Sequence, residues 1–129
     1  MTKIVRFSEK LEFSKNILAF SKKEIALAYG HFSSIHPGHI RYLQNAKSFG
    51  SKLVIGIRGD NDKPKSEKYI FSMKERSESL AMLKIADLLV SLDNDELDEL
   101  VKELRPKVII LGTEYKNILF NQVKETISF

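Results

Sequence analysis

The segment AYGHFSSIHPGHIRYL, residues 28–43, decides the fold of this 129-residue chain. It begins at the end of the apolar run EIALAY, which stops at Gly30 and is typical of a buried strand. It continues into PGHIRYLQNAKSFG, where apolar residues recur at helical spacing between an early proline and a late glycine. All three histidines of the chain lie where the strand passes into the helix: His31, His36 and His39.

The strand–loop–helix pattern of this segment repeats along the chain. Four apolar runs predict buried strands: EIALAY (24–29), LVIGI (53–57), LLVSL (88–92) and KVIIL (107–111). Helices are predicted between them, beginning near Pro37, at a capping box of Ser72 and Glu75, and at a cap formed by Asp93. The alternation predicts an α/β fold, a Rossmann-like parallel sheet with helices on both faces. Ligands of such sheets bind beyond the carboxyl ends of the strands, and the histidines follow one of those ends.

The two ends of the chain lie outside this alternation. Residues 1–23 are interpreted as an N-terminal lead-in, and residues 24–129 as one domain. In the lead-in, Ser8 is expected to cap a helix that packs against the sheet edge through Leu11, Ile17 and Leu18. The tail from Tyr115 to Phe129 is predicted to be helical.

The composition indicates a globular cytoplasmic protein. Its 43% hydrophobic and 29% charged residues are ordinary values, and no run is long enough to span a bilayer. The N-terminus lacks the apolar core of a secretory signal, and the absence of cysteine excludes disulfides and thiolate metal sites. The net charge of +4 is spread along the chain without a dense basic block, so we expect neither nucleic acid nor membrane as a partner.

The histidine loop has the chemistry of a phosphate site. Gly30 lets the chain turn sharply off the strand and lets a ligand approach the backbone. Gly38 and His39 lie at the opening of a helix, whose free amide groups and dipole favour an anion. His36 and His39 are three residues apart across the loop–helix junction, so both imidazoles can point at that anion.

This loop resembles the signature of the HxGH nucleotidyltransferase superfamily, present here as His36-Pro37-Gly38-His39. The wider pattern Gly-x-Phe-Asp-x-x-His-x-Gly-His corresponds to residues 30–39, with Ser33 in place of the aspartate. The chain is similar to cytidylyltransferase-like members over nearly its whole length. It is closest in pattern to the heptose 1-phosphate adenylyltransferase domain of ADP-heptose synthase and to glycerol-3-phosphate cytidylyltransferase.

The resemblance implies transfer of a nucleotidyl group from ATP or CTP to a sugar or polyol phosphate, with release of pyrophosphate. It assigns catalytic roles to His36, His39 and Lys65. Nucleotide-binding positions implied by the family are Gly30, His31, Phe32, Gly38, Gly112 and Tyr115. Substrate-binding positions are Lys65, Lys68 and Arg76. Magnesium is expected to arrive with the nucleotide, with no metal held by the protein alone, and a homodimer is one expectation because relatives are commonly dimeric.

Two departures from the family pattern leave alternatives open. Ser33 carries no charge, and a late Arg-x-x-x-x-Ile-Ser-Thr-like segment of the relatives does not occur before Phe129. We therefore expect a domain truncated at its C-terminus, as part of a longer protein. A non-catalytic nucleotide-binding or scaffold module is the alternative function. A zinc site built from the histidines and a fragment of an aminoacyl-tRNA synthetase are disfavoured by residue spacing and by chain length.

Overall fold

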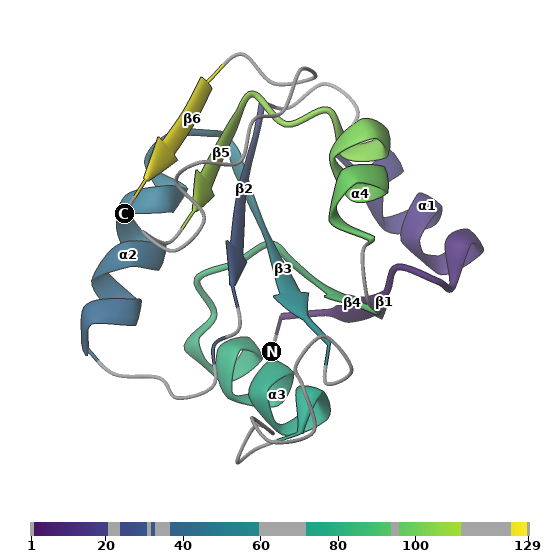
Figure 1. Ribbon diagram of the computed structural model, residues 1–129, viewed down its shortest axis with the longest axis horizontal. Coiled ribbons are helices and arrows are strands. Elements are labelled where there is room, and N and C mark those ends of the chain that lie inside the picture. Colours follow the sequence, from purple (N-terminus) through teal and green to yellow (C-terminus); the bar gives the residue numbers. More distant parts are fainter. Residues whose placement is uncertain are drawn as a thin grey trace.

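The computed structural model describes residues 2–20, 24–30, 32, 37–59, 72–93, 96–111 and 125–128. In these ranges, helices flank a six-stranded sheet with the order β1-β4-β3-β2-β5-β6 (Figure 1). The strands are β1 (Ile4–Arg6), β2 (Ile25–Gly30), β3 (Lys52–Arg58), β4 (Leu88–Leu92), β5 (Val108–Leu111) and β6 (Glu125–Ser128). The helices are α1 (Lys10–Leu18), α2 (Pro37–Lys47), α3 (Met73–Leu83) and α4 (Leu97–Leu104).

Parallel pairing brings the carboxyl ends of the central strands to one edge of the sheet. Every pair in the sheet is parallel, which confirms the predicted Rossmann-like architecture. β2 lies between β3 and β5, with Gly30 in register with Ile57 and Tyr29 in register with Leu111. The first five residues of β2 are all buried, as expected of a parallel strand covered on both faces.

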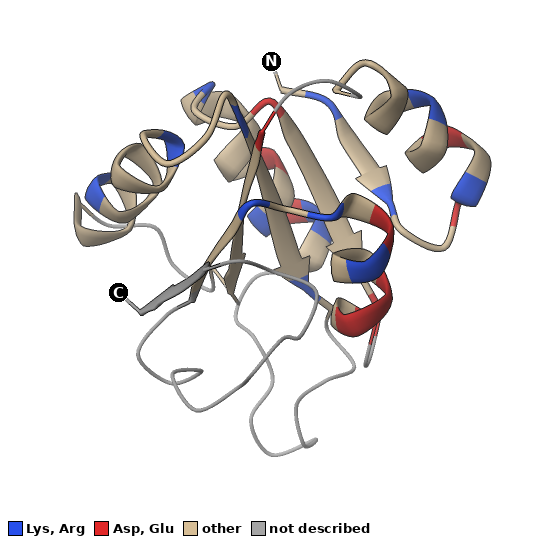
Figure 2. Ribbon diagram, turned by 90° about the horizontal axis from the view of Figure 1, so that it is seen from above, with Lys and Arg blue, Asp and Glu red and all other residues tan. Residues whose placement is uncertain are grey.

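Two hydrophobic cores cover the two faces of the sheet. On one face, α1 and α4 bury Phe13, Leu100, Val101 and Leu104 against the strands. On the other, α2 and α3 bury Tyr42, Leu43, Ala46, Leu80 and Ala81. Figure 2 shows the strands almost free of charged residues, which gather on the helices and at the strand ends. In the described ranges, no helix combines the length and apolar character that crossing a membrane would need.

The start of α3 matches the capping box predicted from the sequence. The Ser72 hydroxyl accepts a hydrogen bond from the Glu75 amide at 3.2 Å, and the Glu75 carboxylate accepts one from the Ser72 amide at 3.3 Å. These reciprocal bonds satisfy two amide groups that a helix start otherwise leaves free. The helix therefore begins at the expected residue, directly after the long β3–α3 connection.

The lead-in segment is part of the sheet. The sequence did not predict β1, which pairs in parallel with the predicted strand β4. α1 confirms the predicted helix and the packing of Ile17, but its N-cap is Glu9, without a side-chain bond, rather than Ser8. The burial expected for Leu11 and Leu18 is wrong, since each is 70% exposed. The side of α1 that faces the core is instead the side that carries Phe13. This residue is fully buried, and its ring lies edge-on to Phe7 at 4.9 Å between centroids.

Two further expectations are corrected. Residues Glu125–Ser128 form β6, paired parallel with β5, where a helix was expected. The segment contains β-branched Thr126 and Ile127, and the neighbouring strand offers an edge for pairing. Asp93 does not cap α4, whose N-cap is Glu96. The Asp93 carboxylate instead accepts a hydrogen bond from the Arg6 guanidinium at 3.1 Å, a contact between distant parts of the chain.

Candidate functional site

The site is built where β2 ends and α2 begins. Gly30 is the last residue of β2, and Pro37, Gly38 and His39 are the first residues of α2. The carboxyl ends of β3 and β5 flank Gly30 through the parallel register of the sheet. This is the edge at which open α/β sheets bind their ligands.

Phe32 is the anchor of the β2–α2 connection. Its side chain is only 5% exposed, although its backbone has φ = 51°, in the left-handed region that residues other than glycine rarely adopt. Its ring centroid lies 6.1 Å from that of His39 and 6.4 Å from that of Tyr42, within the range of aromatic pairs. Burial of the ring beside two residues of α2 offsets the strain of the Phe32 backbone.

Gly30 makes room for this anchor. A Cβ atom at Gly30 would lie 3.3 Å from the Phe32 ring, closer than most such contacts. The glycine therefore serves the packing of the aromatic ring, and the sharp turn expected from the sequence stays a prediction. The contact between the Phe32 and His39 rings brings the end of β2 close to the start of α2.

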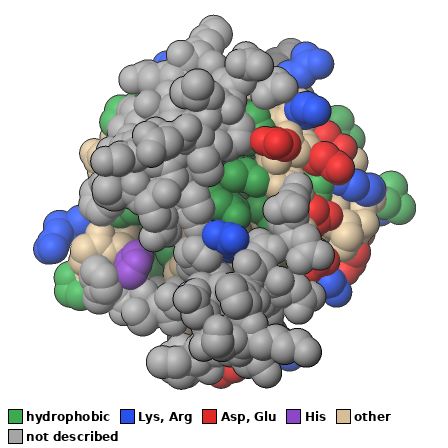
Figure 3. Space-filling model, in the orientation of Figure 1, with side chains coloured by type: hydrophobic (Ala, Val, Ile, Leu, Met, Phe, Trp, Pro, Cys, Tyr) green, Lys and Arg blue, Asp and Glu red, His purple; other side chains and the backbone are tan. Residues whose placement is uncertain are grey.

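The charge around the start of α2 favours an anion. Of the four helices in the described ranges, α2 alone has no acidic residue in its first turn. Acidic side chains gather over α4 instead (Figure 3), where Asp98, Glu99 and Glu103 are exposed. The positive dipole end of α2 therefore favours a phosphate there, beside the half-buried His39.

Arg76 lies at the carboxyl end of β3, on α3. Its side chain is 2% exposed, and its Nη1 donates a hydrogen bond to the backbone oxygen of Arg58 at 3.0 Å. Arg58 is the last residue of β3, so the guanidinium ties α3 to the strand end from which the lysine-rich connection departs. The predicted contact of Arg76 with the substrate stays a prediction.

Six of the predicted site residues lie outside the described residues: His31, His36, Lys65, Lys68, Gly112 and Tyr115. The structure describes Gly30, Phe32, Gly38, His39 and Arg76, and it brings the first four together at the β2–α2 junction. Within the described residues, no group of three or more His, Asp or Glu side chains is arranged to hold a metal ion.

The family comparison matches the segment that carries this geometry. The family model described as cytidylyltransferase-like matches residues 27–129, from the middle of β2 onward. The chain belongs to the cytidylyltransferase-like family of nucleotidyltransferases. The resemblance that the histidine loop suggested is thereby confirmed.

Curated relatives of this cytidylyltransferase-like chain are longer proteins. The bifunctional protein HldE of Geobacter sulfurreducens is 35% identical over 113 residues, which are 83% of this chain and 23% of that protein. The bifunctional protein HldE of Helicobacter pylori strain P12 is 31% identical over 110 residues, 83% of this chain and 24% of that protein. The chain therefore spans about a quarter of the length of these relatives.

A solved structure shares the fold. The crystal structure of the lipopolysaccharide core biosynthesis protein from Thermoplasma volcanium superposes with a TM-score of 0.70 at 22% sequence identity. The similarity covers 83% of this chain and 96% of that one. It supports the α/β architecture of the cytidylyltransferase-like domain independently of the sequence matches.

Tyr42 is a residue of this region that the sequence did not single out. It lies one helical turn after His39, is 5% exposed, and its hydroxyl donates a hydrogen bond to the backbone oxygen of Ile110 at 2.6 Å. The apolar spacing of α2 predicts that position 42 is buried, but tyrosine also carries a hydroxyl that needs a partner when buried. The need of this hydroxyl for a hydrogen-bond partner was the signal in the sequence that could have pointed to Tyr42.

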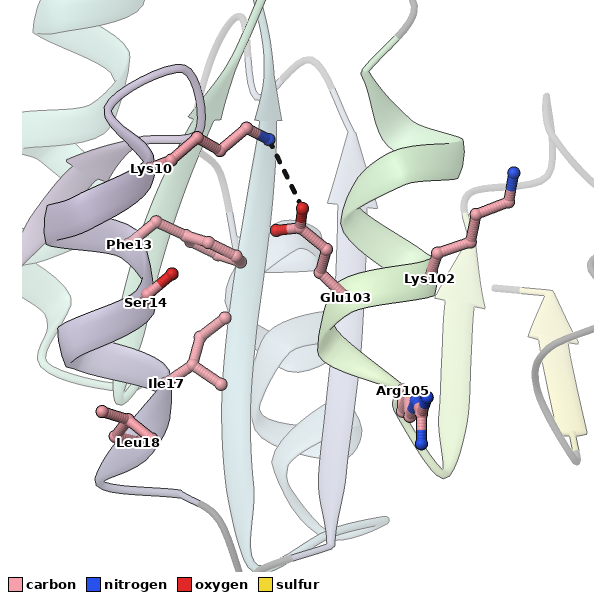
Figure 4. Close-up of a pocket in the computed structure, with 8 residues that line it drawn as sticks. All are labelled: Lys10, Phe13, Ser14, Ile17, Leu18, Lys102, Glu103 and Arg105. Carbon is pink, nitrogen blue, oxygen red and sulfur yellow. Dashed lines mark ion pairs between the residues drawn. The ribbon is translucent and has the colours of Figure 1, made fainter.

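A separate groove of about 700 Å³ lies between α1 and α4 (Figure 4). Its walls combine the apolar side chains of Phe13 and Ile17 with charged ones, including Lys10, which pairs with Glu103 at 3.7 Å. The groove is on the face of the sheet opposite α2, and none of the site residues that the structure describes lines it.

Proposed function

We propose that this chain transfers a nucleotidyl group from ATP or CTP to the phosphate of a sugar or polyol phosphate, with release of pyrophosphate. The observation that carries the proposal is the start of α2. A histidine lies in the first turn of a helix free of acidic residues there, at the carboxyl end of a central strand, in a member of a nucleotidyltransferase family. Because the donor is a nucleoside triphosphate, we expect the reaction to occur in the cytoplasm.

The reaction needs charge stabilisation more than covalent chemistry. An oxygen of the acceptor phosphate attacks the α-phosphorus of the donor and forms a new P–O bond. The bond from the α-phosphorus to the bridging oxygen breaks, and pyrophosphate leaves with that electron pair. Negative charge grows on the oxygens around the α-phosphorus, where imidazole donors and helix amides are most effective. We assign this stabilisation to His36 and His39 together with the first amides of α2.

The remaining predicted residues divide between the two substrates. Gly30, Phe32 and Gly38 lie within the structured junction and would contact the nucleotide through their backbone, next to His31. Gly112 and Tyr115 follow β5 and would hold the base. Lys65, Lys68 and Arg76 would bind the acceptor phosphate, the two lysines from the connection that follows β3.

Magnesium would arrive with the nucleotide. It prefers phosphate oxygens and water to an all-protein cage, and it neutralises charge on the triphosphate when bound. The amides and imidazoles at the start of α2 suit phosphate oxygens rather than a cation. The chain's own residues therefore bind and orient the triphosphate.

Pyrophosphate release tests the proposal directly. The chain is incubated with magnesium, ATP or CTP, and a panel of sugar and polyol phosphates. We expect release with one nucleotide and one class of acceptor, and a loss of about 10²–10³-fold in kcat for His39→Ala, the usual effect of removing one donor to a developing charge. Gln44→Ala, on the exposed side of the same helix, is the matched control and should retain activity. Nucleotide binding without turnover for any acceptor would favour the binding module instead.

A further inference from the structure

We propose that Tyr42 is a positioning residue for the nucleotide site, which holds the His39 imidazole and the end of β5 in one fixed arrangement. The inference rests on the proposed function, because its purpose is to align two halves of a nucleotide site. It concerns a side chain that would not itself touch the reacting atoms.

The first link is the hydrogen bond to β5. The Tyr42 hydroxyl donates to the Ile110 oxygen at 2.6 Å, a short bond between buried groups 68 residues apart in sequence. Ile110 is in register with Ala28 of β2 and precedes Gly112, the predicted base contact, by two residues. The bond therefore fastens the middle of α2 to the strand that precedes the predicted base contact.

The second link runs through Phe32. The rings of Tyr42 and His39 flank the Phe32 ring, at 6.4 Å and 6.1 Å between centroids. Phe32 is buried and holds a left-handed backbone conformation, which persists only where the surroundings determine it. Tyr42 supplies part of those surroundings, so a change at its hydroxyl propagates to the wall against which His39 rests.

The hydrogen bond to Ile110 and the ring contacts with Phe32 both hold α2 in place against the sheet. α2 can move relative to the sheet only by breaking a buried hydrogen bond and by disturbing the ring cluster. His39 is three residues before Tyr42 and shares its face of the helix. The imidazole is thereby held at a set distance from the end of β5, which a site that grips both triphosphate and base requires.

Tyr42→Phe removes the hydroxyl and keeps the ring. Two readouts are needed: the Kd of the full chain for ATP with magnesium and for CTP with magnesium, and the NMR resonance of the His39 imidazole C–H, assigned by its loss in His39→Gln. We expect the Kd for the preferred nucleotide to rise about fivefold, the weight of one ordinary hydrogen bond. We also expect the His39 resonance to shift, because the Phe32 ring current on it changes.

Thr2→Val is the matched control. The Thr2 hydroxyl also bonds to a distant backbone oxygen, that of Ala86 at 3.0 Å, but near the amino ends of β1 and β4. Valine keeps the shape of the threonine side chain and removes its hydrogen bond to Ala86. If Tyr42 were only a stabilising residue, both variants would melt earlier, while the Kd and the His39 resonance of the folded proteins would stay as in the wild type. That outcome overturns the proposal.

Two further results keep the test decisive. If Tyr42→Phe does not fold, Phe32→Leu removes the intervening ring, and an unchanged His39 resonance in that variant would overturn the second link. If the wild type binds neither nucleotide, the proposed function fails. The His39 resonance of Tyr42→Phe then still decides whether the tyrosine holds the imidazole.

Discussion

Gly50 is a position where we expect the addition of one methyl group to lower the stability of the protein clearly. It follows α2 in the turn that leads to β3. A Cβ atom there would lie 2.8 Å from the Ala26 nitrogen and 2.9 Å from the Glu24 oxygen, both backbone atoms that cannot rotate away. The same Glu24 oxygen accepts hydrogen bonds from the Ser51 and Lys52 amides, at 2.8 Å and 3.2 Å, so a shift disturbs the start of two strands.

The magnitude follows from the size of that shift. Ordinary contact begins at 3.4 Å, so the backbone must move by several tenths of an ångström for Gly50→Ala to fit. Overpacking of this kind typically lowers the free energy of unfolding by about 1–3 kcal/mol. In a chain of this length that corresponds to a fall in Tm of roughly 4–12 °C, measured by calorimetry or circular dichroism.

Gly56→Ala and Gly50→Asn test whether close backbone contact explains the glycine at position 50. In Gly56→Ala, in the middle of β3, the new Cβ meets only side-chain atoms at 3.4 Å, so its Tm should change little. Gly50→Asn separates two explanations of the glycine. The sequence suggested the usual glycine after a helix, whose left-handed backbone asparagine also accepts. The structure has no glycine with positive φ among the described residues, and close approach makes asparagine as harmful as alanine. A Gly50→Ala protein as stable as Gly56→Ala, or a fully stable Gly50→Asn, would refute the account.

Three further predictions concern packing, capping and the buried arginine. Phe13→Ala should lower the free energy of unfolding by about 3–5 kcal/mol in a urea titration, because the ring is fully buried, whereas Leu18→Ala, at a site 70% exposed, should change it by less than about 0.5 kcal/mol. Ser72→Ala should lower it by about 0.5–2 kcal/mol through loss of the capping box, while Ser79→Ala, inside the same helix, should be neutral or slightly stabilising; equal effects would exclude the cap as the cause. Arg76→Met should lower it by about 1.5–3 kcal/mol in the absence of any ligand, since the bond to the Arg58 oxygen is lost, and an unchanged apoprotein would contradict the structural role of this guanidinium.

The central strands could be predicted because their local pattern is sufficient. Runs such as LVIGI and LLVSL are almost entirely apolar, bounded by polar residues, and of strand length, which fits burial on both faces of a parallel sheet. The two edge strands, β1 and β6, could not be predicted from their local pattern. β1 has three residues and β6 has four. Each is a strand because it pairs with a neighbouring strand, and the local sequence does not show that long-range pairing.

In the candidate site, too, features set by adjacent residues could be predicted and contacts between distant elements could not. Gly30 and His39 could be found because the strand end, the loop and the helix start are adjacent in sequence. The hydrogen bonds from Tyr42 to Ile110 and from Arg76 to Arg58 join residues on different elements. Which buried polar side chain meets which backbone oxygen depends on how the helices are set against the sheet, and no spacing rule in the sequence contains that information.

The most direct test of the central claim is a calorimetric titration of the chain with ATP and with CTP, each with magnesium, for the wild type and His39→Ala. We predict that the wild type binds one nucleotide in preference to the other and that this binding is weakened at least tenfold in His39→Ala, with Gln44→Ala unchanged. Equal binding by wild type and His39→Ala, or no binding of either nucleotide by the wild type, would contradict the claim that the start of α2 is a triphosphate site.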